Sequence, residues 1–280
     1  MHLFRGKSSA MIEIAILLIL GIIAGIVAGL FGLGGGVLFT PILFFVLSDA
    51  GIENPVVLTI GSSLFCTFIA AAGSSVRQFQ QKNFFWKDGL KVGLMGAAGV
   101  YLGKLVITSP YYSKQEFVIF FSLLLFYVAY MFYRRGNNKS KIIKSNNNEI
   151  AISQSLVTGG LGGFVAALAG IGGGGVMVPL LNLLYKKHFS RAVSISSLAI
   201  VMISLSGWVQ LGLAGKGIET LTAFHWGYVD FGAALPLAIG GLFGGFVGAL
   251  FNLKVDRRYL QLAFAVLAVG MAIKLIAEVF

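Results

Sequence analysis

The sequence predicts an all-α membrane protein with about eight long transmembrane helices, two short half-helices after glycine-rich elbows, and two inverted repeats. Hydrophobic residues make up 57% of the 280 residues and charged residues 11%. Because a soluble domain of this length cannot bury so much apolar surface, lipid must surround most of the chain. A glycine-rich segment that follows a long apolar run also occurs twice, about half the chain apart.

The long apolar runs are long enough to be transmembrane helices. At about 1.5 Å per residue, a run of about twenty residues covers the apolar core of a bilayer. Two shorter runs, 37–47 and 176–185, reach about 16 Å by the same rise, which predicts half-helices or strongly tilted helices. The predicted long spans are 12–31, 56–76, 92–108, 116–133, 153–171, 193–213, 231–250 and 259–277.

The repeated glycine-rich segments, here called elbows, occupy residues 32–41 and 170–179. Their glycines and prolines match at one constant offset without a gap, and Pro41 and Pro179 end them as structural residues. Each glycine inside a helix lowers the stability of the helix by about 1 kcal/mol relative to alanine. Consecutive glycines do, however, allow the backbone to bend and to approach a ligand closely. A helix break at the same point of two copies is the pattern expected of a transporter.

The duplication divides the chain into a first repeat at 1–135, a cytoplasmic polar linker at 136–150, and a second repeat at 151–280. Basic loops face the cytoplasm because translocating Lys and Arg is disfavoured. In one model, the long span before each elbow and the short run after it together return the chain to the side from which the span started. All four basic loops then lie inside and the repeats are inverted. Parallel repeats would place two basic loops outside. The basic loops are 77–91, 134–144, 186–191 and 254–258, and the loops with few Lys or Arg residues are 48–55, 109–115 and 214–230.

The elbows are predicted to bind an anion. The half-helices are expected to begin at Val37 and Val176, so that their unpaired amides point back into the glycines. A helix start carries about half a positive charge, and its unpaired N–H groups suit an oxyanion. Close helix packing is the alternative role of glycine. We expect that role for two sets at four-residue spacing, Gly21, Gly25 and Gly29, and Gly240, Gly244 and Gly248.

Paired serines form a second repeated feature, at 62–63 and 196–197. Their hydroxyls could cap the start of a span or donate to an anion, and both interpretations stay open. Thr40, Thr67, Ser204 and Gln210 are among further polar residues that could line a path. The candidate substrate-binding residues are Gly34, Gly35, Gly36, Thr40, Ser62, Ser63, Gly172, Gly173, Gly174, Gly175, Ser196, Ser197 and Gln210.

Several function classes are disfavoured by what the spans lack. No acidic residue lies well inside a predicted span, whereas cation and proton pumps keep one there. The single Cys66 excludes an internal disulfide and any CxxC motif. No His, Cys and acid occur together at span depth, so neither an enzyme, a metal site nor a cofactor is predicted. The net charge of +11 lies in short loops, so no nucleic-acid binding is expected.

The elbows, the serine pairs and the segment from His225 to Asp230 together permit a family comparison. The chain resembles the sulfite exporter TauE/SafE family from about residue 12 to 277. The resemblance implies secondary transport of a small sulfur-containing or organic anion, such as sulfite, a sulfonate or sulfoacetate, across the bacterial cytoplasmic membrane. Val37 departs from the pattern by replacing the fourth glycine found at Gly175, and the first copy lacks a His-Trp-Gly match.

The expected partners are therefore a small anion and the lipid bilayer. A passive anion channel of the same architecture is the alternative function. Coupling to a proton or another cation, the direction of transport and assembly into a homo-oligomer all stay open at this point.

Overall fold

The computed structural model describes residues 7–31, 35–80, 84–137, 149–215, 219–251 and 257–279. Helices dominate these residues, and the elements of the first half are α1 (Lys7–Phe31), α2 (Gly36–Asp49), α3 (Pro55–Gln80), α4 (Trp86–Ile107) and α5 (Lys114–Asn137). Those of the second half are α6 (Ile152–Ala169), α7 (Gly174–Pro179), the π-helical η1 (Leu180–Leu184), α8 (Phe189–Ala214), β1 (His225–Trp226), β2 (Val229–Asp230), α9 (Phe231–Phe251) and α10 (Arg257–Val279).

By length and composition, six helices of the described residues can cross a membrane: α3, α4, α5, α6, α8 and α10. α1 and α9 contribute shorter apolar stretches, Met11–Val27 and Phe231–Val247. The prediction of a helical membrane protein is confirmed. One departure is the antiparallel hairpin of β1 and β2, in which His225 pairs with Asp230.

A short helix follows each elbow, as predicted, but it begins earlier than expected. α2 begins at Gly36 and α7 at Gly174, not at Val37 and Val176. The residues before them, Gly35 and Gly173, have φ values of 80° and 78°. This left-handed backbone favours glycine, and it lets the carbonyl of each residue accept the first amides of the new helix.

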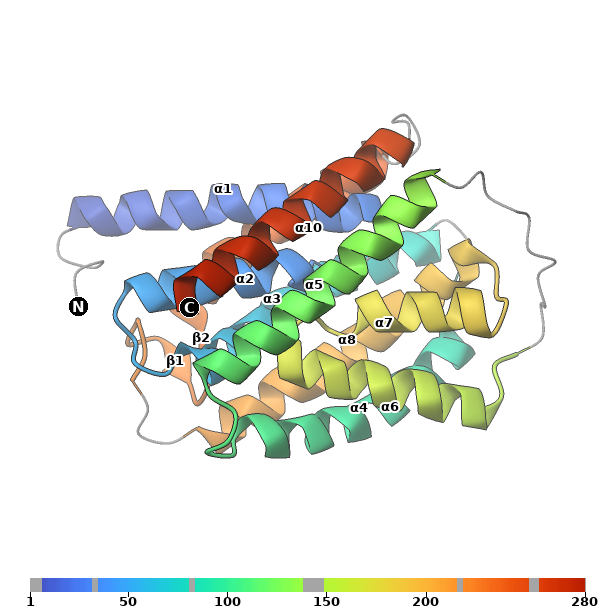
Figure 1. The fold of residues 1–280 in the computed structure, drawn as a ribbon, viewed down its shortest axis with the longest axis horizontal. Helices are drawn as coiled ribbons and strands as arrows, with labels where there is room; N and C mark the ends of the chain where they lie inside the picture. The colour runs from blue at the N-terminus through green and yellow to red at the C-terminus, as the bar shows by residue number, and fades with distance from the viewer. Residues whose placement is uncertain are drawn as a thin grey trace.

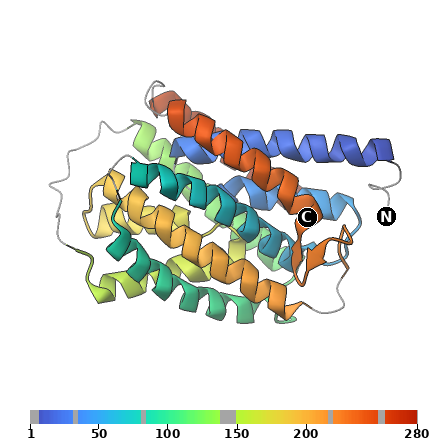
Figure 2. The same ribbon diagram turned by 180° about the vertical axis from the view of Figure 1, so that it is seen from behind.

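α3 and α8 form the centre of the bundle and run antiparallel. The Ser74 Oγ atom lies 3.4 Å from the Ser197 Oγ atom, and Leu64 packs at Gly207 further along the pair. α4 packs along α8 and α9 along α3 (Figure 2). α6 then covers α4, α1 covers α9, and α5 packs against α10 (Figure 1).

Glycines allow the outer helix pairs to approach closely. A Cβ atom at Gly21 would collide with the carbonyl of Leu237, and one at Gly25 with the backbone of Gly241. Gly240 and Gly244 meet α1 in the same way. The packing role predicted for these four glycines is confirmed. Gly29 and Gly248 are the remaining members of the two sets, and their surroundings lie outside what the structure describes.

Two helices begin a turn or more before the apolar runs that predicted them. α4 starts at Trp86 rather than at 92, and α8 at Phe189 rather than at 193. Asp88 and Arg191, which the sequence placed in loops, therefore lie in the first turn of a helix and are buried. The apolar runs do not extend over these turns because the turns contain charged side chains, Lys87 and Asp88 in α4 and Arg191 in α8.

Candidate functional site

The two elbows are brought against each other in the middle of α3 and α8. We call this region the elbow junction and define it by Gly36, Thr40, Ser63, Thr67, Gly170, Gly172 and Ser204. A Cβ atom at Gly36 would lie 2.5 Å from the Cα atom of Ile171, so the first residue of α2 touches the second elbow. Only glycine allows this approach.

One hydrogen-bond chain joins the two halves at the elbow junction. The Thr40 and Ser63 hydroxyls lie 2.8 Å apart, and Ser63 donates to the carbonyl of Gly170 at 3.0 Å. Thr40 comes from α2, Ser63 from α3, and Gly170 ends α6 with a φ of 71°. The chain therefore satisfies a carbonyl that the broken helix leaves without an intrahelical partner.

Two further hydroxyls at the elbow junction have no hydrogen-bond partner among the described residues. The Thr67 and Ser204 side chains are fully buried, and neither hydroxyl oxygen has a partner. They flank the second elbow, because a Cβ atom at Gly172 would lie 2.7 Å from Thr67 Cγ2 and 3.0 Å from Ser204 Oγ. A buried hydroxyl without a partner costs about 1–3 kcal/mol, so such a pair is a candidate for ligand contact.

The predicted elbow glycines serve different purposes. Gly34 lies outside the described residues. Gly173 is pressed against the backbone of Gly162, so packing already requires a glycine there. Gly174 is the first residue of α7, and a Cβ atom at Gly175 would make an ordinary contact of 3.4 Å with Val128. Of the predicted glycines, Gly36 and Gly172 are those the structure places at the elbow junction.

The serine pairs do not cap their helices, so that interpretation is wrong. Ser62 and Ser63 lie two turns inside α3, and the Ser62 hydroxyl accepts the backbone N–H of Asp230 at 2.9 Å. Ser196 and Ser197 both donate to the carbonyl of Val193 in their own helix. By helical rise, Ser197 lies about 10 Å along α8 from Ser204.

The remaining predicted residues lie within the short helices and in α8. Pro41 is inside α2, and Pro179 ends α7 where the chain continues as a π-helix. The Gln210 side chain donates to the Ser206 hydroxyl at 2.6 Å, about 9 Å along α8 from Ser204 by helical rise. Its described contacts do not connect it to the elbow junction.

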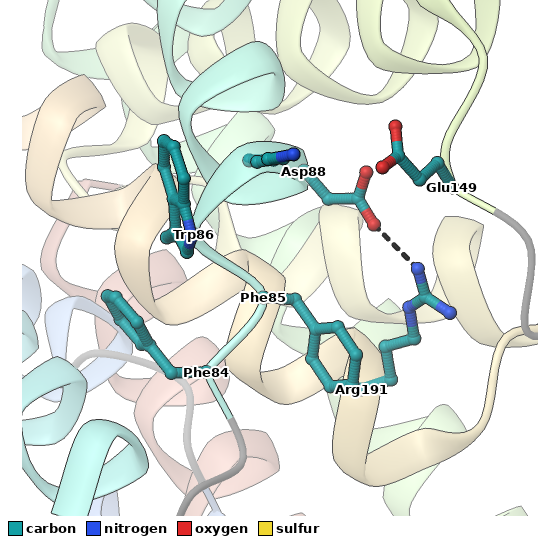
Figure 3. Close-up of a pocket in the computed structure, with 7 residues that line it drawn as sticks. Phe84, Phe85, Trp86, Asp88, Glu149 and Arg191 are labelled. Atoms are coloured by element: carbon teal, nitrogen blue, oxygen red, sulfur yellow. Dashed lines mark hydrogen bonds and ion pairs between the residues drawn. The ribbon is translucent and has the colours of Figure 1, made fainter.

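A second candidate site lies where α4 and α8 begin. A cavity of about 200 Å³ is lined by Phe84, Phe85, Trp86, Lys87, Asp88, Glu149 and Arg191, and we call it the α4–α8 cavity (Figure 3). An Arg191 Nη2 atom donates to Asp88 Oδ2 at 2.8 Å, with side chains only 8% and 3% exposed. The other Asp88 oxygen accepts the N–H of Ile150 at 3.1 Å.

The surroundings of this ion pair are apolar on one side and basic on the other. The Arg191 guanidinium carbon lies 4.5 Å from the ring centre of Phe85, within cation–π range. Lys187, in the loop before α8, is also buried. Burial lowers the pKa of its ammonium, the positive charge of Arg191 lowers that pKa further, and Asp88 raises it.

A signal for this cavity is present in the charge pattern of the sequence. Asp88 and Arg191 belong to loops that the charge pattern places on the same side of the membrane. Opposite charges on one side of a membrane protein are candidates for pairing. Among the described residues, no group of three His, Cys, Asp or Glu side chains could hold a metal ion.

The fold and the two sites define a helical, multi-pass membrane protein. The sequence model of the sulfite exporter TauE/SafE family matches residues 17–275, so the chain belongs to that family. A probable membrane transporter protein of Methanocaldococcus jannaschii is 30% identical over 88% of this chain and 89% of its own length. Similar proteins, also named probable membrane transporters, occur in Bacillus subtilis (27% identical; 94% of this chain, 97% of its own) and Haemophilus influenzae (25%; 94% and 97%).

Proposed function

We propose that the chain is a secondary transporter that moves a small sulfur-containing or organic anion through the elbow junction. The observation that carries this proposal is the pair of buried hydroxyls, Thr67 and Ser204, which lie at the second elbow and have no partner in the part of the chain that the structure describes. A hydroxyl can donate a hydrogen bond to an oxyanion. A donor without another partner gives up no hydrogen bond within the protein when it binds the anion, so the new bond contributes fully to the binding free energy. Membership of the sulfite exporter family supports the same substrate class.

The polar groups of the elbow junction favour a negative substrate. Its side chains are hydroxyls, with no carboxylate among them. α2 and the helical segment 174–184 both begin at the elbows, so the partial positive charge of each helix start faces this region. Two helix starts supply only about one unit of charge, which favours a mono- or divalent anion over a trianion.

We further propose that the two halves are inverted repeats with eight long membrane-spanning helices, including α1 and α9. In each half the short helical segment after the elbow, α2 or 174–184, returns the chain to the side from which α1 or α6 starts. α3 and α8 have 26 residues each, occupy the same position in their halves and run antiparallel. α5 and α10 are also antiparallel, since Ser122 bonds Ala272 and Phe132 meets Phe264. Equivalent helices that run in opposite directions support inversion of one half relative to the other.

The proposed location is the bacterial cytoplasmic membrane. A negative interior contributes about 2.3 kcal/mol per charge per 100 mV to the outward movement of an anion. Export therefore needs no coupling ion, whereas uptake would need a proton or another cation. This topology places the α4–α8 cavity at the cytoplasmic face and the β1–β2 hairpin at the external face. Assembly into a homo-oligomer is compatible with either export or uptake of the anion.

Flux into liposomes tests the proposal. Purified protein in liposomes should transport at least one of sulfite, thiosulfate, sulfoacetate or a small sulfonate, with saturation and with a response to an imposed gradient. A conducted current that rises linearly with voltage at a high unitary rate would instead identify a passive anion channel. Absence of anion flux, together with flux of a cation, would contradict both.

A further inference from the structure

The α4–α8 cavity joins parts of the chain that are far apart in sequence. Its walls come from the segment before α4, the first turn of α4, the first turn of α8, and Glu149 just before α6 (Figure 3). From this end the two helices stay in contact, because Gly89 packs against Leu198 and Gly93 against Met202. The cavity therefore lies at the end of the seam along which the first and second halves meet.

Arg191 and Asp88 hold this end of the seam closed. Their ion pair links the first turn of α8 to the first turn of α4, and Asp88 also accepts the Ile150 amide before α6. The Phe85 amide donates to the Ser194 hydroxyl at 3.3 Å, which adds a second link between the same segments. If one partner of a buried ion pair is displaced, the other is left as an unpaired charge away from water, which is strongly unfavourable.

The chemistry that binds Asp88 is also the chemistry that binds an oxyanion. Arginine carries five N–H donors in a planar fork that suits carboxylate, sulfonate and similar groups. Cations outnumber anions around the cavity, with Lys87, Lys187 and Arg191 opposed by Asp88, while Glu149 is paired with Lys91 at 3.2 Å. A volume of about 200 Å³ accommodates a small organic anion.

The opposite end of the bundle has no such ion pair among its described residues. There Asp230, just before α9, binds the Thr222 amide and hydroxyl at 2.9 and 2.6 Å and the Ala233 amide at 3.2 Å. Its own amide donates to Ser62. These partners are neutral, and the residue of α3 at the position that Arg191 holds in α8 is Val57. The two ends are therefore chemically different.

We propose that the α4–α8 cavity is the entrance site for the transported anion and that the Asp88–Arg191 ion pair is its gate. An arriving sulfonate or carboxylate competes with the Asp88 carboxylate for the Arg191 guanidinium. When it displaces Asp88, the link between α4 and α8 is released at this end of the seam. The entrance role rests on the proposed transport function, whereas anion binding in the cavity can be measured by itself.

Trp86 provides a direct probe, because it lines the cavity and the chain has three tryptophans. The other two, Trp208 and Trp226, meet edge to face with their ring centres 5.8 Å apart in a different part of the fold. In a Trp208→Phe/Trp226→Phe background, titration with methanesulfonate or sulfoacetate at constant ionic strength should change Trp86 emission with saturation. Choline chloride should produce no saturable change.

Three variants separate a gate from a structural ion pair. Arg191→Gln should raise the anion dissociation constant measured by Trp86 emission about tenfold, because charge-assisted hydrogen bonds to the anion are lost. Asp88→Asn keeps a hydrogen-bonding side chain but removes the competing charge, so it should strengthen anion binding several-fold. Lys104→Gln removes one cation from the other end of α4 and should leave binding unchanged. If Arg191→Gln does not fold, Arg191→Lys should still weaken binding.

The outcomes distinguish this inference from the proposed function. Anion flux in liposomes with no saturable Trp86 response, or with equal affinities in wild type, Asp88→Asn and Arg191→Gln, would overturn the entrance site and leave the transport function intact. A saturable response that follows the predicted order, in a protein that transports none of the anions, would keep the binding site and overturn the transport function. Weaker binding in Asp88→Asn would show that the pair is structural.

Discussion

Thr67 of α3 and Ser204 of α8 meet at the same glycine, because a Cβ atom at Gly172 would lie 2.7 Å from Thr67 Cγ2 and 3.0 Å from Ser204 Oγ. Both side chains are fully buried, and neither hydroxyl has a partner among the residues that the structure describes. The antiparallel arrangement of α3 and α8 creates this pair, since the two residues are 137 apart in sequence. Two such groups at a helix break are therefore candidates for contact with the transported anion.

Removal of these hydroxyls should improve stability and impair transport. Thr67→Val and Ser204→Ala each delete a buried donor without a partner, so each should raise the free energy of unfolding by about 1 kcal/mol. Each should also lower anion transport by about tenfold, the loss expected for one hydrogen bond to a charged group. Thermal unfolding in detergent and flux in liposomes measure the two effects.

Thr158→Val is the matched control for this pair of variants. Thr158 of α6 is also fully buried with a hydroxyl that has no partner among the described residues, but it lies about 18 Å along α6 from the second elbow by helical rise. It should gain similar stability and keep normal transport. Normal transport in Thr67→Val and Ser204→Ala would exclude these hydroxyls from the substrate path.

The inverted arrangement predicts which loops face the same side. In a Cys66→Ser background, single cysteines at Glu53 and Glu219 should react with an impermeant reagent from outside the cell. Cysteines at Lys87 and Lys186 should react only from the cytoplasmic side. All four wild-type side chains are exposed, so reactivity reports sidedness rather than burial. Labelling of Glu53→Cys and Glu219→Cys from opposite sides would rule out inverted repeats.

Close glycine packing between α1 and α9 predicts a strong effect of added volume. Gly25→Leu places side-chain atoms where the backbone of Gly241 lies, and overpacking of this kind costs about 1–3 kcal/mol or more. Gly270→Ala is the control, because a Cβ atom there meets nothing within 4 Å and alanine favours a helix by about 1 kcal/mol. The melting temperature should fall for the first variant and rise for the second. Equal melting temperatures would mean that α1 can separate from α9 without cost.

Much of the fold was predictable from the sequence because the elbows and apolar runs are local signals. Glycines 170, 172 and 173 have the left-handed backbone that such a break needs, and a short helix follows each elbow. The early starts of α4 and α8 were not predictable from hydropathy, since their first turns contain Lys87, Asp88 and Arg191. The two-residue strands β1 and β2 are too short to produce a periodic pattern.

The candidate sites were less predictable because they depend on which helices meet. Thr67 and Ser204 were recognisable as polar residues of a span, but not as partners across Gly172. The serine pairs were recognisable as repeats, yet Ser62 bonds Asp230 from far along the chain, while Ser196 bonds its own helix. The same motif thus has different contacts in the two halves, and only the three-dimensional arrangement distinguishes them.

Competition for flux tests most directly whether the protein transports a small anion. Liposomes containing the wild-type protein take up labelled sulfoacetate while unlabelled compounds are added outside at equal concentration and ionic strength. We predict that sulfite or a short sulfonate inhibits uptake in a saturable way and that choline or lysine does not. Inhibition by the cations alone, with no effect of sulfite or the sulfonate, would contradict the account.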